Sequence, residues 1–363
     1  MLQILGFFCA FWRVVLARLV ALSTAVSSPS LFDAAWSAGT SGPTSKPDPR
    51  PAETLGEGDD EPGSSVAGPR SQALVCEEAR YLAPGIQQIS TLSGLAMERG
   101  RGAMVYDADG RPYLDLVAGI GVASIGHGHP ALRRALSEQA DKLTVGSFTS
   151  PARLELTKRI AEQAPPLGAD VRAETESPPD ADPDAPRTQL YSGGAEAVES
   201  ALRLARACTG KQEVIGFWGG FHGKTTGVLG LLGGEAKRGM GPLPGGQFVA
   251  PYADCYRCPF KLEPTSCGLH CVEFLRQSIK QATTGNIAAI LVEPMQGTAG
   301  NVIPPPGWLA AVKEVARDNG ALLIADEMIT GWGRTGRMWG VEHSGVRPDI
   351  FTFGKGVAGG VPL

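Results

Sequence analysis

The sequence lacks an excess of charge of either sign, and this absence excludes several classes of protein. Its 363 residues contain 33 Lys and Arg against 37 Asp and Glu, a formal net charge of −4, and the pI is near 5.8. No basic surface for nucleic acid is therefore indicated. Charged residues make up 19% of the chain and hydrophobic residues 43%. These values are typical of a soluble globular chain with one large domain and part of another.

An unbroken membrane-spanning run is also missing. Residues 1–28 are apolar, but Arg13 and Arg18 interrupt them, so the segment is too broken for a membrane span. Because these charges lie inside the apolar stretch, we favour an incidental extension over a signal, and organelle targeting stays open. Residues 37–70 are rich in Gly, Pro, Ser and acids, as in disordered linkers. We predict that residues 1–72 are a disordered or targeting-like extension of a cytoplasmic protein without membrane or nucleic-acid partners.

Downstream, apolar segments of strand length alternate with helical patterns. Helices are expected at 154–163 and 307–320, and strands at 188–191, 213–218, 287–293, 321–327 and 349–355. The alternation predicts an α/β fold, with a mostly parallel sheet and helices on both faces. The polar segment 165–187 has almost no apolar content to bury, so we expect it to be an exposed, mobile loop.

Two of the expected strands end in residues of opposite charge. One apolar run ends at Asp326, and another delivers Lys355 into a glycine-rich loop. This combination suits a pyridoxal-phosphate (PLP) enzyme, because the lysine forms an imine with the cofactor aldehyde. The carboxylate keeps the ring nitrogen protonated, so that the ring can accept electrons. Taken alone, a lysine near a glycine is usually a solvated surface residue.

Three further segments supply parts that such a site needs. Gly193 and Gly194 turn a chain segment into a helix, whose first amides bind phosphate well. Phe221 follows a strand and would stack on a flat ring, with His222 beside it. Glu293 ends a strand before a Pro- and Gly-rich loop. Each has an ordinary alternative: a plain strand-to-helix turn, a core phenylalanine beside a loop histidine, and a carboxylate that faces water.

A different class of protein has to be weighed against this one. The segment 217–226, FWGGFHGKTT, nearly matches the phosphate-binding loop of ATPases, and 321–327 nearly matches their magnesium-binding strand. The loop pattern requires a glycine five residues before the Gly-Lys pair, and the residue there is Trp218. Its bulk would occupy the turn that a glycine must make, so the ATPase interpretation explains fewer segments.

In their order along the chain, SGGAEAVE, FHG, VEPMQG, DEMITGWGRTG and the lysine closely resemble the class-III aminotransferases of PLP fold type I. The resemblance runs from about Ala83 to Leu363 and includes an N-terminal signature around Gly126 and His127. It implies that residues 73–120 contribute to a small domain and that residues 121–363 form the PLP-binding large domain. In the family a C-terminal small domain follows, and this chain ends before it.

The resemblance also implies which residues bind the cofactor: Gly194, Ala195, Phe221, His222, Glu293, Asp326 and Lys355. Lys355 would be the catalytic Schiff-base lysine and Asp326 the catalytic partner of the ring nitrogen. Amides at the start of the helix would hold the phosphate, and Glu293 would lie on the substrate side. Two positions depart from the commoner pattern, because Ala195 replaces a Ser or Thr and Ile329 replaces a Gln.

The activity that the resemblance implies is transfer of an amino group to a 2-oxo acid such as 2-oxoglutarate, by a homodimer. The donor would be an amine or an omega-amino acid of the 4-aminobutyrate or ornithine-derivative type. Other PLP reactions on the same fold (aminomutase, decarboxylase, racemase, lyase) stay open, and so does an inactive truncated relative. The family's small domain carries an arginine for the substrate carboxylate, so we expect no measurable transamination from the chain ending at Leu363.

Four of the seven cysteines lie in one short segment, at Cys255, Cys258, Cys267 and Cys271. A CxxC pair followed by a CxxxC pair would suit zinc or an iron–sulfur cluster. The alternatives are reduced thiols in a surface insertion, or one or two disulfides. A metal would require all four sulfurs to converge on one point, away from the catalytic chemistry.

Overall fold

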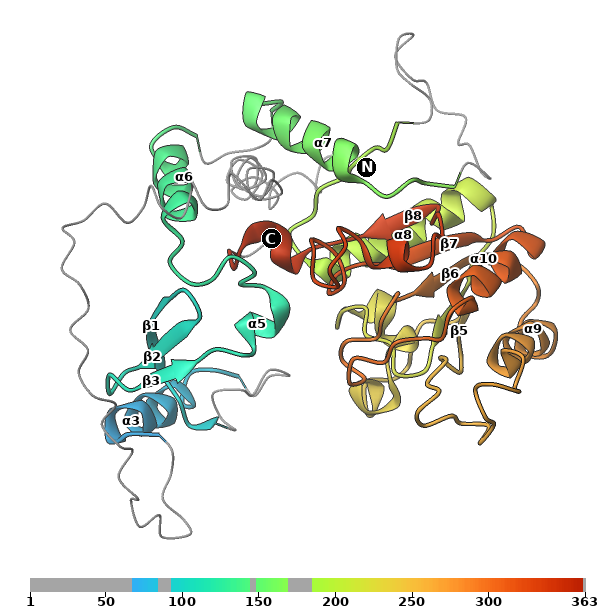
Figure 1. Ribbon diagram of the computed structural model, residues 1–363, viewed down its shortest axis with the longest axis horizontal. Helices are drawn as coiled ribbons and strands as arrows, with labels where there is room; N and C mark the ends of the chain where they lie inside the picture. The colour runs from blue at the N-terminus through green and yellow to red at the C-terminus, as the bar shows by residue number, and fades with distance from the viewer. Residues whose placement is uncertain (1–66, 84–92, 144–147, 169–184, 362–363) are drawn as a thin grey trace. The chain divides into compact units, whose positions relative to one another are not determined.

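The computed structural model describes residues 67–83, 93–143, 148–168 and 185–361, which fall into two compact units divided between Ser137 and Glu138 (Figure 1). Most of the predicted N-terminal extension and of the predicted polar loop at 165–187 lies outside the described residues. Among the described helices, none has the length and apolar character that crossing a membrane requires.

The larger unit is built on a five-stranded sheet with the strand order β5-β4-β6-β7-β8. Its strands are β4 (Glu213–Phe217), β5 (Gln247–Ala250), β6 (Ile287–Val292), β7 (Leu322–Asp326) and β8 (Ile350–Thr352). Every neighbouring pair is parallel, and β4, β6 and β7 are buried along their whole length. Continuous apolar strands buried on both faces are typical of parallel sheets. The predicted mostly parallel sheet is confirmed.

The order of the strands changes direction at β4. The next strand along the chain, β5, lies on one side of β4, whereas β6, β7 and β8 follow in turn on the other side. In open parallel sheets, ligands bind beyond the carboxyl ends of the strands at such a reversal. The loops that follow β4 and β6 therefore border the expected binding site.

Helices cover both faces of the sheet (Figure 1). The helical segments of this unit are α7 (Pro151–Gln163), α8 (Gly194–Thr209), α9 (His270–Ala282), α10 (Trp308–Asp318), η1 (Thr226–Leu231), η2 (Gly234–Lys237), η3 (Gly340–His343) and η4 (Lys355–Ala358). On one face, Leu275 of α9 and Val312 of α10 share an apolar cluster with Ile290. On the other face, Leu202 of α8 clusters with Leu291. The two strand residues are neighbours that point to opposite faces, so helices on both faces are confirmed.

Two elements differ from the sequence expectation. The helix expected at 154–163 begins earlier, at Pro151, because the Ser150 side chain accepts a hydrogen bond from the N–H of Arg153 and caps it. The strand expected at 188–191 is wrong, since these residues pair with no strand in the described part of the chain. A strand exists only through hydrogen bonds to a neighbour, and an apolar pattern does not supply one.

The smaller unit contains an antiparallel sheet of order β1-β2-β3. Its elements are α3 (Pro69–Glu78), β1 (Met97–Arg101), β2 (Met104–Asp107), β3 (Pro112–Leu114) and α5 (Ala118–Gly121). The division between the units falls within α6 (Pro130–Ala140). The carboxylate of Asp109 accepts hydrogen bonds from the N–H groups of Arg70 (3.0 Å) and Ser71 (2.8 Å). Asp109 thereby caps the start of α3, although it lies 38 and 39 residues further along the chain. The end of the N-terminal extension, expected at residue 72, falls inside this helix.

Candidate active site

The carboxyl ends of four parallel strands bring the predicted site residues together in the larger unit. Phe221 and His222 follow β4, Glu293 follows β6, Asp326 ends β7, and Lys355 follows β8. Parallel strands place their carboxyl ends at one edge of the sheet. The sequence prediction that these segments meet is therefore consistent with the topology, and hydrogen bonds between several of them support it.

Asp326 and His222 form a buried pair at the centre of this edge. Nδ1 of His222 lies 2.7 Å from Oδ2 of Asp326, although 104 residues separate them, and their exposures are 3% and 1%. Burial alone lowers the pKa of His222, but the hydrogen bond to Asp326 and the charges of Asp326 and Glu293 outweigh it and raise the pKa. The imidazole of His222 therefore lies at hydrogen-bond distance from the Asp326 carboxylate and is held there by it.

Two contacts to the other oxygen of Asp326 were missed by the sequence reasoning. The N–H of Met328 donates to Oδ1 at 3.1 Å, and the hydroxyl of Thr352 donates to the same atom at 3.3 Å. Thr352 pairs with Asp326 in the ladder between β7 and β8. The signal available in the sequence was the position of a polar residue at the end of the apolar run 350–352. Together these donors fix the direction in which the carboxylate points.

The first turn of α8 lies beside these strand ends. A Cβ added at Gly194 would lie 3.2 Å from Sδ of Met328, and one added at Gly354 would lie 2.8 Å from the same sulfur. Met328 is therefore packed between the start of α8 and the loop that carries Lys355. The next residue, Ala195, touches the backbone at Gly223, where a Cβ would collide with it. The N–H groups of a first helical turn have no partner within the helix and attract anions.

Lys355 opens the short helix η4 directly after β8. It has a left-handed backbone (φ 45°), which is uncommon for a residue with a side chain. The side chain is partly buried. Within the described ranges, no hydrogen bond or ion pair holds its ammonium group. Positions with such backbone strain are often functional, so a lysine with an unengaged amine at this edge is a candidate nucleophile.

Glu293 links the loops that follow β4 and β6. Its Oε1 accepts a hydrogen bond from the N–H of Phe221 at 3.0 Å, and its Oε2 accepts one from Gly297 at 3.4 Å. Burial raises the pKa of Glu293 to about 7; the charge of His222 lowers it and the charge of Asp326 raises it. This carboxyl group therefore titrates near neutral pH.

The titration of Glu293 predicts a pH-dependent stability. Between its ordinary pKa of 4.5 and the folded value of about 7, the folded state holds a proton that the unfolded state has released, so stability falls as pH rises. The two values correspond to about 3 kcal/mol at most. The raised pKa of His222 acts in the same direction. We expect the unfolding free energy, measured by urea titration, to fall between about pH 5 and about pH 8. The fall should be smaller in Glu293→Gln than in the wild type, because glutamine does not titrate. Equal pH dependence of the two proteins would contradict this assignment.

The neighbouring Glu327 does not belong to the binding edge. It is fully buried, and its carboxylate accepts hydrogen bonds from the N–H groups of Gly340 and Val341, both at 2.9 Å, and from the hydroxyl of Thr330. These bonds hold the segment 327–341 in a closed loop. The role of Glu327 is therefore to fix the conformation of the loop that follows Asp326.

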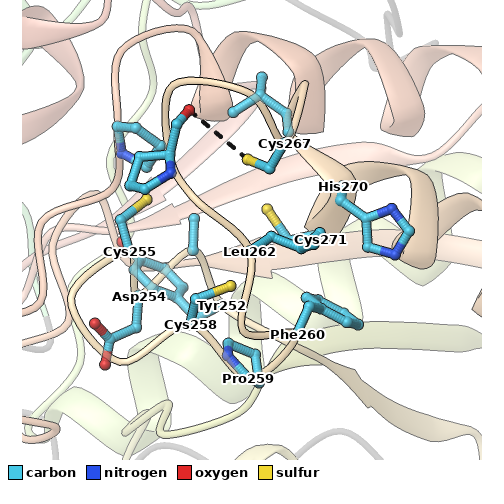
Figure 2. Close-up of a pocket in the computed structure, with 14 residues that line it drawn as sticks. Tyr252, Asp254, Cys255, Cys258, Pro259, Phe260, Leu262, Cys267, His270 and Cys271 are labelled. Carbon is cyan, nitrogen blue, oxygen red and sulfur yellow. Dashed lines mark hydrogen bonds between the residues drawn. The ribbon is translucent and has the colours of Figure 1, made fainter.

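The four clustered cysteines line one pocket between the loop 254–269 and the start of α9 (Figure 2). All four are free thiols, and Sγ of Cys267 faces the carbonyl oxygen of Pro264 at 3.8 Å. In the part of the chain that the structure describes, no group of three or more His, Cys, Asp or Glu is arranged to hold a metal ion. The predicted zinc or iron–sulfur centre therefore has no ligand set here, because sequence spacing does not determine where the sulfurs point.

The cysteine geometry predicts metal-free protein. Burial raises the pKa of Cys255 and of Cys271, and the charges of neighbouring cysteines add to it, so both thiols are protonated at neutral pH. We expect elemental analysis to find no stoichiometric zinc or iron, and a thiol reagent to react with all four cysteines after unfolding. Close to one zinc per chain, lost in a Cys258→Ser variant, would contradict this result.

Comparisons with known proteins agree with this arrangement. The sequence profile of the family described as Aminotransferase class-III matches residues 87–363. The chain is 35% identical over 272 residues to an acetylornithine aminotransferase of Mycolicibacterium smegmatis. This alignment covers 74% of this chain and 60% of the aminotransferase. It is 31% identical over 279 residues to a leucine/methionine racemase of Thermococcus litoralis. This alignment covers 75% of this chain and 59% of the racemase.

A solved structure shows the same fold. The crystal structure of an amine transaminase from an uncultivated Pseudomonas species, in its PLP-bound form, superposes with a TM-score of 0.67 at 30% identity. The match covers 78% of this chain and 64% of that one. The chain thus spans about three fifths of the length of these relatives, between 59% and 64%.

Proposed function

Because this chain belongs to the class-III aminotransferases, PLP-dependent enzymes of fold type I, we propose that it transfers an amino group from an amine or omega-amino acid to a 2-oxo acid. We further propose a donor of the 4-aminobutyrate or ornithine-derivative type, with 2-oxoglutarate as an acceptor. The observation that carries the proposal is the buried Asp326–His222 pair at the edge of the sheet where Lys355 and the first turn of α8 also lie.

The residues at this edge fit the cofactor of the family. Pyridoxal phosphate supplies an aldehyde that reacts with amines and a ring that accepts electrons. The amides of Gly194 and Ala195 would hold its phosphate, since a helix of 16 residues begins there. Ala195 lacks a hydroxyl group, so backbone amides carry this contact. Phe221, half-buried after β4, would stack on the ring.

Asp326 and Lys355 would perform the two chemical tasks. Asp326 would hold the proton on the ring nitrogen, while His222, Met328 and Thr352 keep its carboxylate oriented. The free amine of Lys355 would move a proton between Cα of the substrate and C4′ of the cofactor. Ile329, which replaces the commoner glutamine, packs against Gly297 and offers no hydrogen bond there.

Amino transfer is tested with a panel of amines and 2-oxoglutarate, by following the oxo product. The assay uses the 363-residue protein and the same protein extended by the C-terminal region of the acetylornithine aminotransferase relative. We expect amino transfer from the extended protein, because the family anchors the substrate carboxylate with that region. Failure of both proteins with every donor and acceptor would reject the transaminase proposal and leave the fold untouched.

Racemisation is a second candidate, because one relative at 31% identity is named a leucine/methionine racemase. The same proton transfer at Cα, made to the opposite face, would invert an amino acid without a 2-oxo acid. Chiral chromatography after incubation with L-amino acids alone distinguishes the two reactions. Formation of the D-amino acid without an acceptor would favour the racemase.

We also propose a homodimer located in the cytoplasm. The family resemblance supports the dimer, and so do the exposed apolar side chains of Leu114, Leu116 and Val117 in the smaller unit. The free state of the described cysteines suits a reducing compartment. Residues 73–120 would contribute to the small domain and residues 121–363 would form the large domain. Light scattering on the purified protein tests the dimer.

A further inference from the structure

Both carboxylate oxygens of Glu293 are engaged by the backbone of the protein. Oε1 accepts from the N–H of Phe221 at 3.0 Å and Oε2 from the N–H of Gly297 at 3.4 Å, and the residue is only 6% exposed. Its own carbonyl oxygen accepts a hydrogen bond from the hydroxyl of buried Tyr252 at 2.9 Å. A carboxylate held in this way is directed at the protein and has little surface for a substrate.

A second contact joins the same two loops. Nε2 of Gln296 donates to the carbonyl oxygen of Trp218 at 2.9 Å. A Cβ added at Gly219 would lie 2.9 Å from Oε1 of Gln296, so the loops are in close contact. Glu293 and Gln296 together hold the segment 218–221, which carries the aromatic ring, against the loop that follows β6.

The next residue is held from the other side. His222 is bound through its side chain to Asp326 at 2.7 Å. The Phe221–His222 pair is therefore fixed at two points, through the backbone by Glu293 and through the imidazole by Asp326. The height and tilt of the Phe221 ring follow from these two attachments, since its side chain has few torsions of its own.

We propose that Glu293 is a positioning residue that sets the Phe221 ring against the bound cofactor through the N–H of Phe221, and that it does not contact the substrate. This inference rests on the proposed function, because it assumes that pyridoxal phosphate stacks on Phe221. It replaces the position on the substrate side that the family resemblance implied for Glu293. The ionisable groups that surround the carboxylate are His222, Asp326 and Tyr252.

Two variants of Glu293 separate the hydrogen bond from the charge. Glu293→Ala removes the acceptor for the N–H of Phe221, and we expect the cofactor to bind about tenfold more weakly. The visible circular dichroism band of the bound cofactor should lose intensity, because this band reports how rigidly the protein orients the cofactor ring. Glu293→Gln keeps an amide oxygen that accepts from Phe221, so both properties should recover to within about threefold of the wild type. Absorbance titrations with pyridoxal phosphate and circular dichroism measure these effects without turnover.

Glu213 offers a matched control. It is also 6% exposed and accepts hydrogen bonds from the N–H groups of Thr284 (3.0 Å) and Asn286 (3.2 Å). It lies at the start of β4, at the opposite end of the strand from the site. Glu213→Ala should therefore lower the unfolding free energy but leave the affinity and the circular dichroism of the bound cofactor unchanged.

The outcomes distinguish this inference from the function on which it rests. Wild-type affinity and circular dichroism in Glu293→Ala would overturn the positioning role and leave the proposed function intact. Equal losses in Glu293→Ala and Glu213→Ala would show a general loss of folding and overturn it as well. A Glu293→Gln variant as impaired as Glu293→Ala would exclude the hydrogen-bond route. A wild-type protein that binds no pyridoxal phosphate would contradict both proposals.

Discussion

Replacement of Lys355 by alanine is expected to abolish the imine absorbance of the bound cofactor and all amino transfer. We assign imine formation with the cofactor aldehyde to the amine of Lys355, and alanine has no group that can replace this amine. The same amine would carry the Cα proton, so turnover should fall by at least about three orders of magnitude. Absorbance spectra and turnover, in whichever form of the protein shows transfer, measure the two effects.

Lys280 provides the control for this substitution. It is an exposed lysine in the last turn of α9, a helix that packs on one face of the sheet. Lys280→Ala should keep both the absorbance and the turnover of the wild type. Retained turnover in Lys355→Ala would show that another amine performs the proton transfer.

Replacement of Asp326 by asparagine should leave cofactor bound but slow amino transfer by about two to three orders of magnitude. Asparagine is nearly isosteric with aspartate and keeps one acceptor oxygen, either for His222 or for Met328 and Thr352, so the fold around β7 should survive. It has no charge, so the proton on the ring nitrogen loses its partner and the ring accepts electrons poorly. Stopped-flow absorbance with excess amine measures the step directly.

The control for this variant is Asp318→Asn. Asp318 pairs with Arg276 at 2.7 Å on the surface, away from the strand ends, and such pairs contribute little to stability. Normal rates in Asp326→Asn would refute the role of its charge. Equal slowing in both variants would show that the effect does not arise at the ring nitrogen.

The sequence could predict the parts of this site that depend on local pattern. The apolar run before Asp326 is long enough and uniform enough to indicate a buried parallel strand, and the run before Lys355 is a shorter one. Residues that end parallel strands meet at one edge of the sheet. The positions of Phe221 and Glu293 after their strands follow from the same pattern. These expectations needed no knowledge of tertiary contacts.

Contacts between distant segments could not be predicted in this way. The His222–Asp326 pair spans 104 residues, and the cap that Asp109 provides for α3 spans 38 and 39 residues. The residues at 188–191 have a strand-like pattern but no strand beside them in the described chain. Strand pairing and capping at long range are properties of the folded chain, and local propensity does not encode them.

The cysteines show the same limit for side chains. Their spacing fixes how far apart the backbone positions of Cys258 and Cys267 are along the chain, and this spacing suits a metal centre. The direction of each sulfur depends on the loop conformation, which the structure gives and the spacing does not. All four line one pocket, yet they form no ligand set among the described residues.

Borohydride reduction followed by peptide mass spectrometry tests the central claim most directly. The purified protein is mixed with pyridoxal phosphate, reduced, digested and mapped. We predict one reduced cofactor per chain, attached to Nζ of Lys355. Attachment instead to Lys224, whose Nζ lies 6.0 Å from the centre of the Phe221 ring, or scattered labelling of surface lysines, would contradict the account.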